Sequence, residues 1–397
     1  MPRFEPFAAL RYSPDEPLDD VTAPPYDVLS PSDINTLRAR HDHNIVVVDV
    51  PLERDGPDRY ESAARRLTAW IDKGVLVRDA SPSLTLYRME FTDETGRNRA
   101  TVGVIGALEV VDEDASGVLP HERTTLKAKT DRLDLTRATR CNLSPIWGLS
   151  LTEGLSGLLK QQGETVGQCT DENRVVHRVE RIVDPARLAA ISAAVGSNAV
   201  LIADGHHRYA ISRSYRDEVR QSTGSSQTDA ELTMTYVAEL VDEQLSIDPI
   251  HRVFRGISAG ALAAKLGAFC EITEAGPITA RFAAEVVARG SMCLVHPDGT
   301  GLWLKPRPES FADVRALDGA YLEHALHGVD GIEVTYQHGV QNVVDILRDG
   351  HADAAVLIRP TSIDEIRRTA IERLLMPPKS TFFTPKLRTG LVLRMLD

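Results

Sequence analysis

The chain has 397 residues, of which 42% are hydrophobic and 26% charged, as in a globular protein of two or three domains. Its formal net charge of −12 argues against a nucleic-acid-binding surface, which requires a basic stripe. The cysteines are scattered without a Cys-x-x-Cys pair, which predicts reduced thiols and gives no zinc site or disulfide framework: Cys141, Cys169, Cys270 and Cys293.

The sequence gives no sign of a targeting or membrane segment. Its first residues lack the anatomy of a signal peptide, and no apolar run approaches the ~18 residues of a membrane span. We therefore expect a cytoplasmic protein whose partners include neither a membrane nor a nucleic acid.

The amino-terminal part combines extended and helical patterns. A double proline excludes a helix just before Tyr26 and Asp27, and Ser30 with Pro31 predicts the cap and first residue of a helix. Residues 44–50 are rich in valine and isoleucine, which predicts a central strand. The patterns that follow predict an amphipathic helix over residues 60–73 and a hairpin of residues 83–91 and 101–111.

Residues 119–132 concentrate charge with little apolar content. The charged side chains are His121, Glu122, Arg123, Lys127, Lys129, Asp131 and Arg132. Two interpretations remain open: a surface helix with solvated charges, or a loop and helix that present a carboxylate and several cations to a polyanion. Residues 144–147 then predict a return to a buried strand.

The most distinctive stretch follows an apolar run over residues 200–203, which predicts a buried strand. Asp204 and Gly205 end the run, and a helix is predicted from about Arg208. A strand, a glycine turn and a helix start direct backbone N–H groups and the positive helix end to one place. With His206, His207 and Arg208 around it, this place suits a phosphate or carboxylate. The alternative is an ordinary strand-to-helix turn.

From about residue 256 the pattern predicts a separate α+β module. It contains a predicted hairpin of residues 291–296 and 301–305, and a strand over residues 354–359. Its histidines match no metal-ligand spacing, so we expect solvated side chains at His324, His327 and His338. Just before the module, His251 and Arg252 are a weaker candidate for a site, and we expect them to be a surface pair.

The carboxy-terminal segment is rich in prolines, hydroxyls and cations. The polar side chains include Lys379, Ser380, Thr381, Thr384, Lys386 and Arg388. Such a segment fits an anion clamp, but it also fits a plain edge strand, because lysine and proline commonly protect such edges. Residues 390–396 predict a closing strand.

Four stretches together resemble the family called domain of unknown function 1015, and the resemblance covers essentially the whole chain. They are Ala23-Pro-Pro-Tyr-Asp-Val28, Leu119-Pro-His-Glu-Arg-Thr124 with Asp131-Arg132 and Asn142-Leu-Ser-Pro145, Ala203-Asp-Gly-His-His-Arg-Tyr209, and Met376-Pro-Pro-Lys-Ser-Thr-Phe-Phe383. The family name carries no activity, so the function must be sought in a second resemblance.

The segment Asp204-Gly-His-His-Arg208 is similar to the signature of the ParB/sulfiredoxin superfamily. Its members hold nucleotide phosphates with a Gly-x-x-Arg turn, and its free-serine kinases carry an Asp-Gly-His-His-Arg form with a glutamate as the base. Sulfiredoxins have a cysteine where this chain has His206, so sulfinic-acid repair is not implied. The partition proteins that bind CTP have basic surfaces, which this acidic chain lacks.

We therefore expect a mixed α/β protein: a ParB/sulfiredoxin-like nucleotide-binding core over residues 1–255, an α+β module over residues 256–375, and a segment over residues 376–397 that returns to the core. The implied activity is phosphoryl transfer from ATP or ADP, with Mg²⁺, to a small hydroxyl metabolite such as serine. The expected base is Glu122 or Asp27. His206 and His207 are the other expected catalytic residues. The expected nucleotide- and phosphate-binding residues are Asp204, Gly205, Arg208, Lys127, Arg132, Lys379, Ser380, Thr381 and Lys386.

Two other classes of function stay open. One is a nucleotide-binding regulatory protein without turnover. The other is a metal hydrolase based on His206 and His207, which lacks a recognisable third ligand. The phosphate acceptor, the choice of nucleotide, the role of Asp204 as metal ligand or helix cap, and the oligomeric state are not determined by the sequence.

Overall fold

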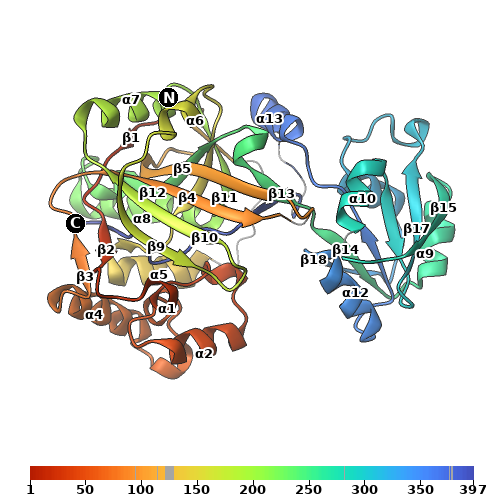
Figure 1. The fold of residues 1–397 in the computed structure, drawn as a ribbon, viewed down its shortest axis with the longest axis horizontal. Coiled ribbons are helices and arrows are strands. Elements are labelled where there is room, and N and C mark those ends of the chain that lie inside the picture. Colours follow the sequence, from red (N-terminus) through yellow and green to blue (C-terminus); the bar gives the residue numbers. More distant parts are fainter. Residues whose placement is uncertain (94, 114, 121–128, 281, 375, 377–378) are drawn as a thin grey trace.

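The structure is a computed structural model, and it describes all residues except 94, 114, 121–128, 281, 375 and 377–378. Two bodies lie side by side in Figure 1, one around a nine-stranded sheet and one around a six-stranded sheet. Both marked chain ends belong to the larger body. Among the described residues, no helix has the length and apolar character needed to cross a membrane.

The nine-stranded sheet is mixed, which confirms the predicted α/β class. Its order is β6-β11-β8-β12-β5-β4-β10-β9, with β1 beside β5; β12 is parallel to β8, whereas β11 is antiparallel to it. The strands are β1 (Phe4–Glu5), β4 (Leu84–Thr92), β5 (Asn98–Glu109), β6 (Val118–Pro120), β8 (Ile146–Ser150), β9 (Glu164–Thr170), β10 (Val176–Ile182), β11 (Val200–Asp204) and β12 (Leu232–Glu239). The predicted hairpin is formed by β4 and β5.

Close packing across this sheet depends on a glycine of β5. A Cβ atom on Gly103 would lie 2.3 Å from the ring of Tyr236, which belongs to the neighbouring β12. Tyr236 is fully buried and meets Trp147 of β8 edge to face, with 5.3 Å between the ring centroids. Only glycine leaves room for this aromatic layer. The layer supports the part of the sheet from which β11 runs to the candidate site.

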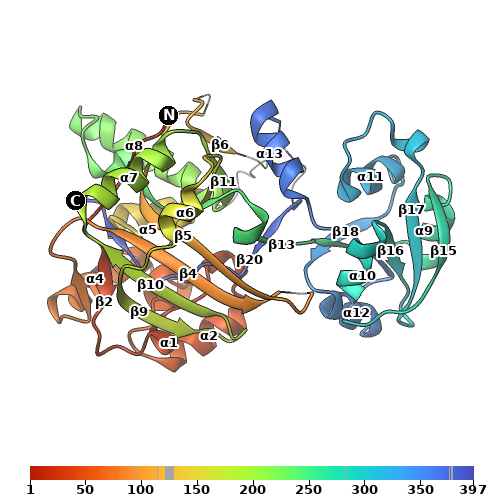
Figure 2. The same cartoon turned by 45° about the horizontal axis from the view of Figure 1, so that its top comes forward.

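Helices surround the sheet (Figure 2). They are α1 (Leu18–Val21), α2 (Pro31–Arg40), α3 (Val46–Asp49), α4 (Arg59–Asp72), α5 (Lys129–Thr139), α6 (Leu155–Leu159), α7 (Pro185–Gly196) and α8 (His206–Thr223). The predicted helix start at Ser30 is confirmed: its hydroxyl accepts from the Asp33 amide at 3.2 Å, and Asp33 completes a capping box.

The strand predicted over residues 44–50 is wrong, because these residues form the short helix α3. The Asn44 side chain accepts a hydrogen bond from the Val46 amide at 3.0 Å, and the Ile45 amide is taken by the Val21 carbonyl. All four helical residues are buried, so an apolar run without periodicity was equally compatible with a helix. Tertiary burial outweighed the strand preference of valine.

The second body is a six-stranded sheet with its own helices. Its order is β15-β17-β16-β19-β14-β18. The elements are β14 (His251–Arg255), β15 (Cys270–Pro277), β16 (Met292–Val295), β17 (Thr300–Pro306), β18 (Glu333–Gln337) and β19 (Ala354–Leu357), with α9 (Ala259–Leu266), α10 (Phe282–Arg289), α11 (Asp318–Ala325) and α12 (Val340–Arg348). The predicted hairpin is formed by β16 and β17.

Strand β14, at the end of the range assigned to the first domain, pairs with β18 and β19 of this second sheet. The expected surface pair within it is wrong, since both His251 and Arg252 are buried. His251 Nδ1 accepts from the Ile358 amide at 3.2 Å, and burial lowers the pKa of His251 to about 3.

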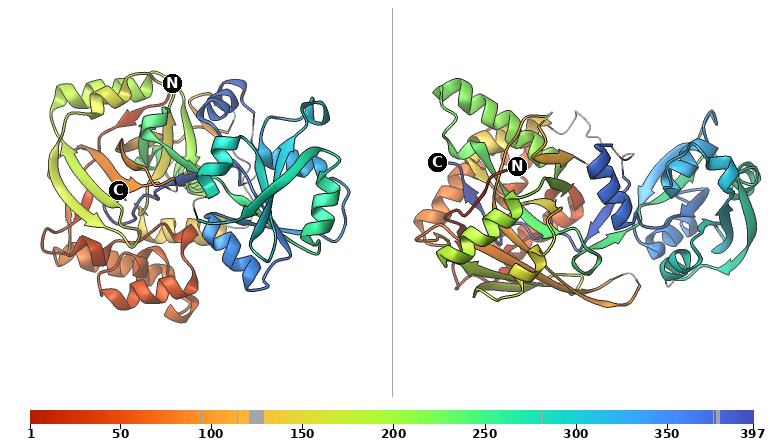
Figure 3. Two further views of the ribbon diagram at one scale, coloured as in Figure 1. Left: turned by 45° about the vertical axis from the view of Figure 1, so that its right-hand side comes forward. Right: turned by 90° about the horizontal axis from the view of Figure 1, so that it is seen from above.

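The carboxy-terminal segment runs along the larger body. β20 (Phe382–Thr384) pairs with β13 (Ser246–Asp248), and β21 (Arg394–Met395) pairs with β7 (Cys141–Asn142). Helix α13 (Ile363–Glu372) lies between the two bodies (Figure 2, Figure 3). Its Ile366 packs in the same apolar cluster as Phe383 of β20.

Candidate functional site

The candidate site is built on the turn between β11 and α8. β11 ends at Asp204, α8 begins at His206, and Gly205 between them has φ +85°. The predicted succession of strand, glycine and helix is therefore present. A Cβ atom on Gly205 would lie 3.1 Å from the Arg208 guanidinium carbon. Glycine is favoured here both by the backbone conformation and by the arginine that folds over it.

Arg208 meets two carboxylates at this turn. Its Nη2 lies 3.1 Å from Asp204 Oδ2 and 3.8 Å from Asp27 Oδ2, while Nη1 donates to the Pro145 carbonyl. The Arg208 side chain is 11% exposed, whereas Asp27 is 39% exposed. The structure thus brings together three predicted site residues, and the backbone carbonyl fixes the guanidinium in place.

Lys386 approaches the same turn from the carboxy-terminal segment. Its Nζ lies 3.6 Å from Asp204 Oδ2 and 4.2 Å from the centroid of the Phe382 ring. Burial alone raises the pKa of Asp204, but Lys386, Arg208 and His206 outweigh it and hold that pKa well below its usual value. Asp204 is therefore an ionised carboxylate shared between two cations.

Arg132 of α5 lies near the turn and has partners of its own. Its Nη1 lies 3.2 Å from Asp49 Oδ1, and its guanidinium lies 3.9 Å from the centroid of the Tyr26 ring. Burial raises the pKa of Asp49, and Arg132 opposes that shift. Arg132, Arg208 and Tyr26 line the same small cavity of about 50 Å³. Two guanidinium groups from different helices therefore converge on one place.

A larger cavity of about 620 Å³ opens on the other side of Lys386. Its size is typical of sites for small molecules. Its lining residues include Phe91, Asp248, His338, Phe382, Lys386 and Arg388. His338 is exposed, as expected, and its ring stacks on Phe382, with 4.6 Å between centroids and an interplanar angle of 17°. The cavity thus offers an aromatic wall beside the cation that contacts Asp204.

The remaining predicted residues are distributed differently. Glu122 and Lys127 lie outside the described residues. His206 and His207 open α8, and both side chains are partly buried. The carbonyl of Lys379 accepts from Arg252, and that of Ser380 accepts from Thr361 at 2.8 Å.

Ser380 also lines a third cavity, of about 680 Å³, together with residues of both bodies. Thr381 is partly buried and directly precedes β20. Among the tail residues predicted to bind phosphate, Lys386 reaches the turn through its ion pair with Asp204.

Sequence reasoning missed three residues of this region. Tyr26 precedes the predicted site residue Asp27, but an uncharged side chain does not by itself indicate its contact with Arg132. The strand predicted over residues 44–50 gave Asp49 no functional position, whereas the structure places it at the end of α3 beside Arg132. Asp248 gave no signal, since its position depends on the pairing of β13 with β20.

Asp248 is expected to make the free energy of unfolding depend on pH. Burial, reinforced by Asp93, raises the pKa of Asp248 to about 6 from 3.8. The folded state therefore binds a proton more tightly than the unfolded state, so stability falls as pH rises from about 4 to about 6. Relative to Asp248→Asn, we expect the wild type to lose about 2 kcal/mol of unfolding free energy across this window.

Urea unfolding of both proteins at several pH values measures this difference. Asp242→Asn is the matched control, because Asp242 is an exposed residue of the same region. Parallel pH profiles for wild type and Asp248→Asn would show that Asp248 does not titrate in this way.

The mixed α/β fold and the cationic turn define a protein with a candidate anion-binding site. The chain belongs to the family described as "Protein of unknown function (DUF1015)", whose model matches residues 4–320. None of the curated proteins matches the chain.

Three solved structures are similar to part of the chain. A conserved hypothetical protein from Pyrococcus furiosus has 14% identity and a TM-score of 0.36, with 69% of this chain and 92% of that chain covered. Free serine kinase in complex with AMP has 14% identity and a TM-score of 0.36, with coverage of 69% and 89%. SbnI from Staphylococcus aureus, with a C-terminal truncation, has 14% identity and a TM-score of 0.38, with coverage of 72% and 85%.

Proposed function

We propose that the protein is a nucleotide-dependent phosphotransferase that acts on a small hydroxyl metabolite, with free serine as the first candidate acceptor. The observation that supports this proposal is the pair of cations, Arg208 and Lys386, on either side of Asp204 at the start of a helix. Phosphoryl transfer depends mainly on positioning and on neutralising the charge of the transferred group. A helix start with two cations beside a cavity of about 620 Å³ supplies both.

The described residues suggest a division of roles. Gly205 and the first turn of α8 would hold phosphate oxygens, with Arg208 as a bidentate partner. Lys386 and Arg132 would neutralise charge that develops on the transferred group. Lys127, Lys379, Ser380 and Thr381 remain proposed phosphate contacts, and His206 and His207 proposed neighbours of the reacting groups.

The carboxylates at the turn fit a metal ion that arrives with the nucleotide. Asp204 and Asp27 both face Arg208 Nη2, so their charges are already balanced by cations. A phosphate chain that pairs with Arg208 and Lys386 would release these carboxylate oxygens, which are the ligand type that Mg²⁺ prefers. We therefore propose ATP or ADP together with Mg²⁺, rather than Mg²⁺ alone.

A base must accept the hydroxyl proton of the acceptor. Glu122 is the first choice, because the free-serine kinases that share the Asp-Gly-His-His-Arg form use a glutamate in this role. Asp27 is the alternative, and it already lies at Arg208. Serine as acceptor rests on the same resemblance, whereas the phosphate-binding role rests on the geometry of the turn.

The experiment is to incubate the protein with ATP or ADP, Mg²⁺ and a panel of hydroxyl metabolites, and to follow phosphate transfer by mass spectrometry. We expect O-phosphoserine only when nucleotide and serine are both present. Nucleotide binding without transfer to any acceptor would favour a regulatory protein without turnover. A protein that binds no nucleotide would contradict the proposal as a whole.

A further inference from the structure

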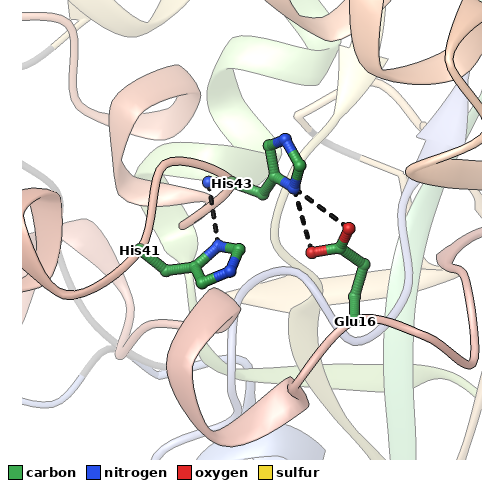
Figure 4. A group of neighbouring side chains, drawn as sticks. All are labelled: Glu16, His41 and His43. Carbon is green, nitrogen blue, oxygen red and sulfur yellow. Dashed lines mark hydrogen bonds and ion pairs between the residues drawn. The ribbon is translucent and has the colours of Figure 1, made fainter.

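Glu16, His41 and His43 form a cluster that the proposed phosphotransferase chemistry does not use. Glu16 precedes α1, His41 follows the last residue of α2, and His43 comes two residues later. One ligand atom from each of the three side chains lies within 4.8 Å of the others. Among the residues that the structure describes, this is the one such group of histidine, cysteine or carboxylate side chains. Figure 4 shows the three side chains facing one another.

The separation of the ligand atoms suits one shared ion. Both carboxylate oxygens of Glu16 lie 3.0 Å from His43 Nδ1. Nitrogen and oxygen ligands bind zinc at about 2.1 Å, which places two tetrahedral ligands about 3.4 Å apart. Small side-chain movements therefore suffice to admit an ion. The side chains of His43 and Glu16 are 30% and 14% exposed, so water can reach the remaining position.

The backbone and the neighbouring rings hold this cluster in place. The Tyr12 hydroxyl donates to the His43 carbonyl at 2.6 Å, and the Trp70 ring meets His43 edge to face at 5.6 Å. The Asn44 amide donates to the His41 carbonyl at 3.0 Å, and the Glu16 amide to the Ser13 carbonyl at 3.0 Å. An ion would thus find its ligands on two segments that are already fixed, which lowers the cost of ordering them.

We propose that Glu16, His41 and His43 bind a zinc-like divalent ion, with water as the fourth ligand. Two imidazoles and one carboxylate are a donor set that zinc and neighbouring transition metals favour over the hard ions Mg²⁺ and Ca²⁺. The ion would link the chain before α1 to the connection between α2 and α3. No local sequence spacing marks this set, because Glu16 lies 27 positions before His43.

Binding has a specific consequence for one backbone hydrogen bond. In the structure the His43 amide donates to His41 Nδ1 at 3.1 Å. A neutral imidazole that binds a metal uses one nitrogen for the ion and keeps a proton on the other. Whichever nitrogen of His41 binds the ion, Nδ1 stops accepting. The His43 amide must therefore lose this bond when the ion binds.

The test is titration of chelator-treated full-length protein with Zn²⁺ against a chromophoric competing chelator. We expect one equivalent bound, with Glu16→Gln and His43→Gln each weakening the affinity at least about tenfold, the loss that outer-sphere changes alone commonly cause. His327→Ala, an exposed histidine of the second body, is the matched control. Wild-type affinity in both site variants, or no binding by the wild type, would overturn the proposal.

Two further measurements keep the test independent of a variant's folding. At the same Zn²⁺ concentration, the melting temperature should rise by the same amount in the wild type and His327→Ala and by less in Glu16→Gln, since a ligand stabilises the state that binds it in proportion to its affinity. In the wild type, Zn²⁺ should shift the NMR resonance of the His43 amide, whereas Mg²⁺ should not. An unshifted His43 amide in the zinc-saturated protein would place the ion elsewhere.

Discussion

Arg208→Ala is expected to weaken nucleotide binding by about tenfold to a hundredfold, because a charge-assisted bidentate contact contributes roughly 1.5–3 kcal/mol. Arg208 folds over Gly205 and presents Nη2 at the start of α8, where the phosphates are proposed to lie. Isothermal titration calorimetry with ATP and ADP measures the loss. Arg208→Lys should lie between the wild type and alanine, since it keeps the charge but not the planar fork.

The control for this prediction is Arg213→Ala on the same helix. Arg208 donates to the Pro145 carbonyl, and Arg213 donates to the Val111 carbonyl at 3.1 Å, so each variant leaves one backbone carbonyl without its arginine donor. Thermal melting should show some loss of stability in both variants, whereas only Arg208→Ala should lose nucleotide affinity. Equal nucleotide affinities for the wild type and Arg208→Ala would remove the turn from the site.

Glu122→Gln is expected to lower phosphate transfer to serine by about 10²–10⁴, with little change in nucleotide affinity, because general-base removal has this effect on rate. A carboxylate that merely forms an exposed ion pair contributes at most about 1 kcal/mol, and to stability rather than to rate. The transfer rate of each protein is therefore compared with its melting temperature and nucleotide affinity. The rate alone should fall if Glu122 is the base.

Asp27→Asn is the companion variant, because Asp27 lies 3.8 Å from Arg208 Nη2. If Asp27 neither accepts the proton nor binds Mg²⁺ but only balances the charge of Arg208, its removal should leave transfer competent and should not weaken phosphate binding, since a competing carboxylate is gone. A Glu122→Gln protein that transfers phosphate at the wild-type rate would reject Glu122 as the base. The loss of rate should then appear in Asp27→Asn.

Burial explains the main errors of the sequence analysis. The valines of α3 are all buried. Their sequence therefore shows no alternation of apolar and polar residues that would distinguish a helix from a strand. His251 and Arg252 are polar, which predicts exposed side chains. However, β14 lies inside the second sheet and is paired on both sides. In both cases the environment came from neighbours distant in sequence, which local patterns do not encode.

The sequence by itself determined the features that depend on local sterics and hydrogen bonding. These include the capping box at Ser30, the hairpin of β4 and β5, and the turn in which Gly205 at positive φ separates β11 from α8. Each follows from a few adjacent residues, whose backbone preferences act within one turn of chain.

Only the tertiary structure decided which charged groups meet. Asp204 lies between Arg208, four residues away, and Lys386 from the far end of the chain. Glu16 lies against His43 across 27 positions. Such contacts are fixed by the way the sheet and helices pack, because ion pairs and metal ligands impose no local sequence period. The residues of both proposed sites are therefore supplied by the sequence, but only the fold brings them together.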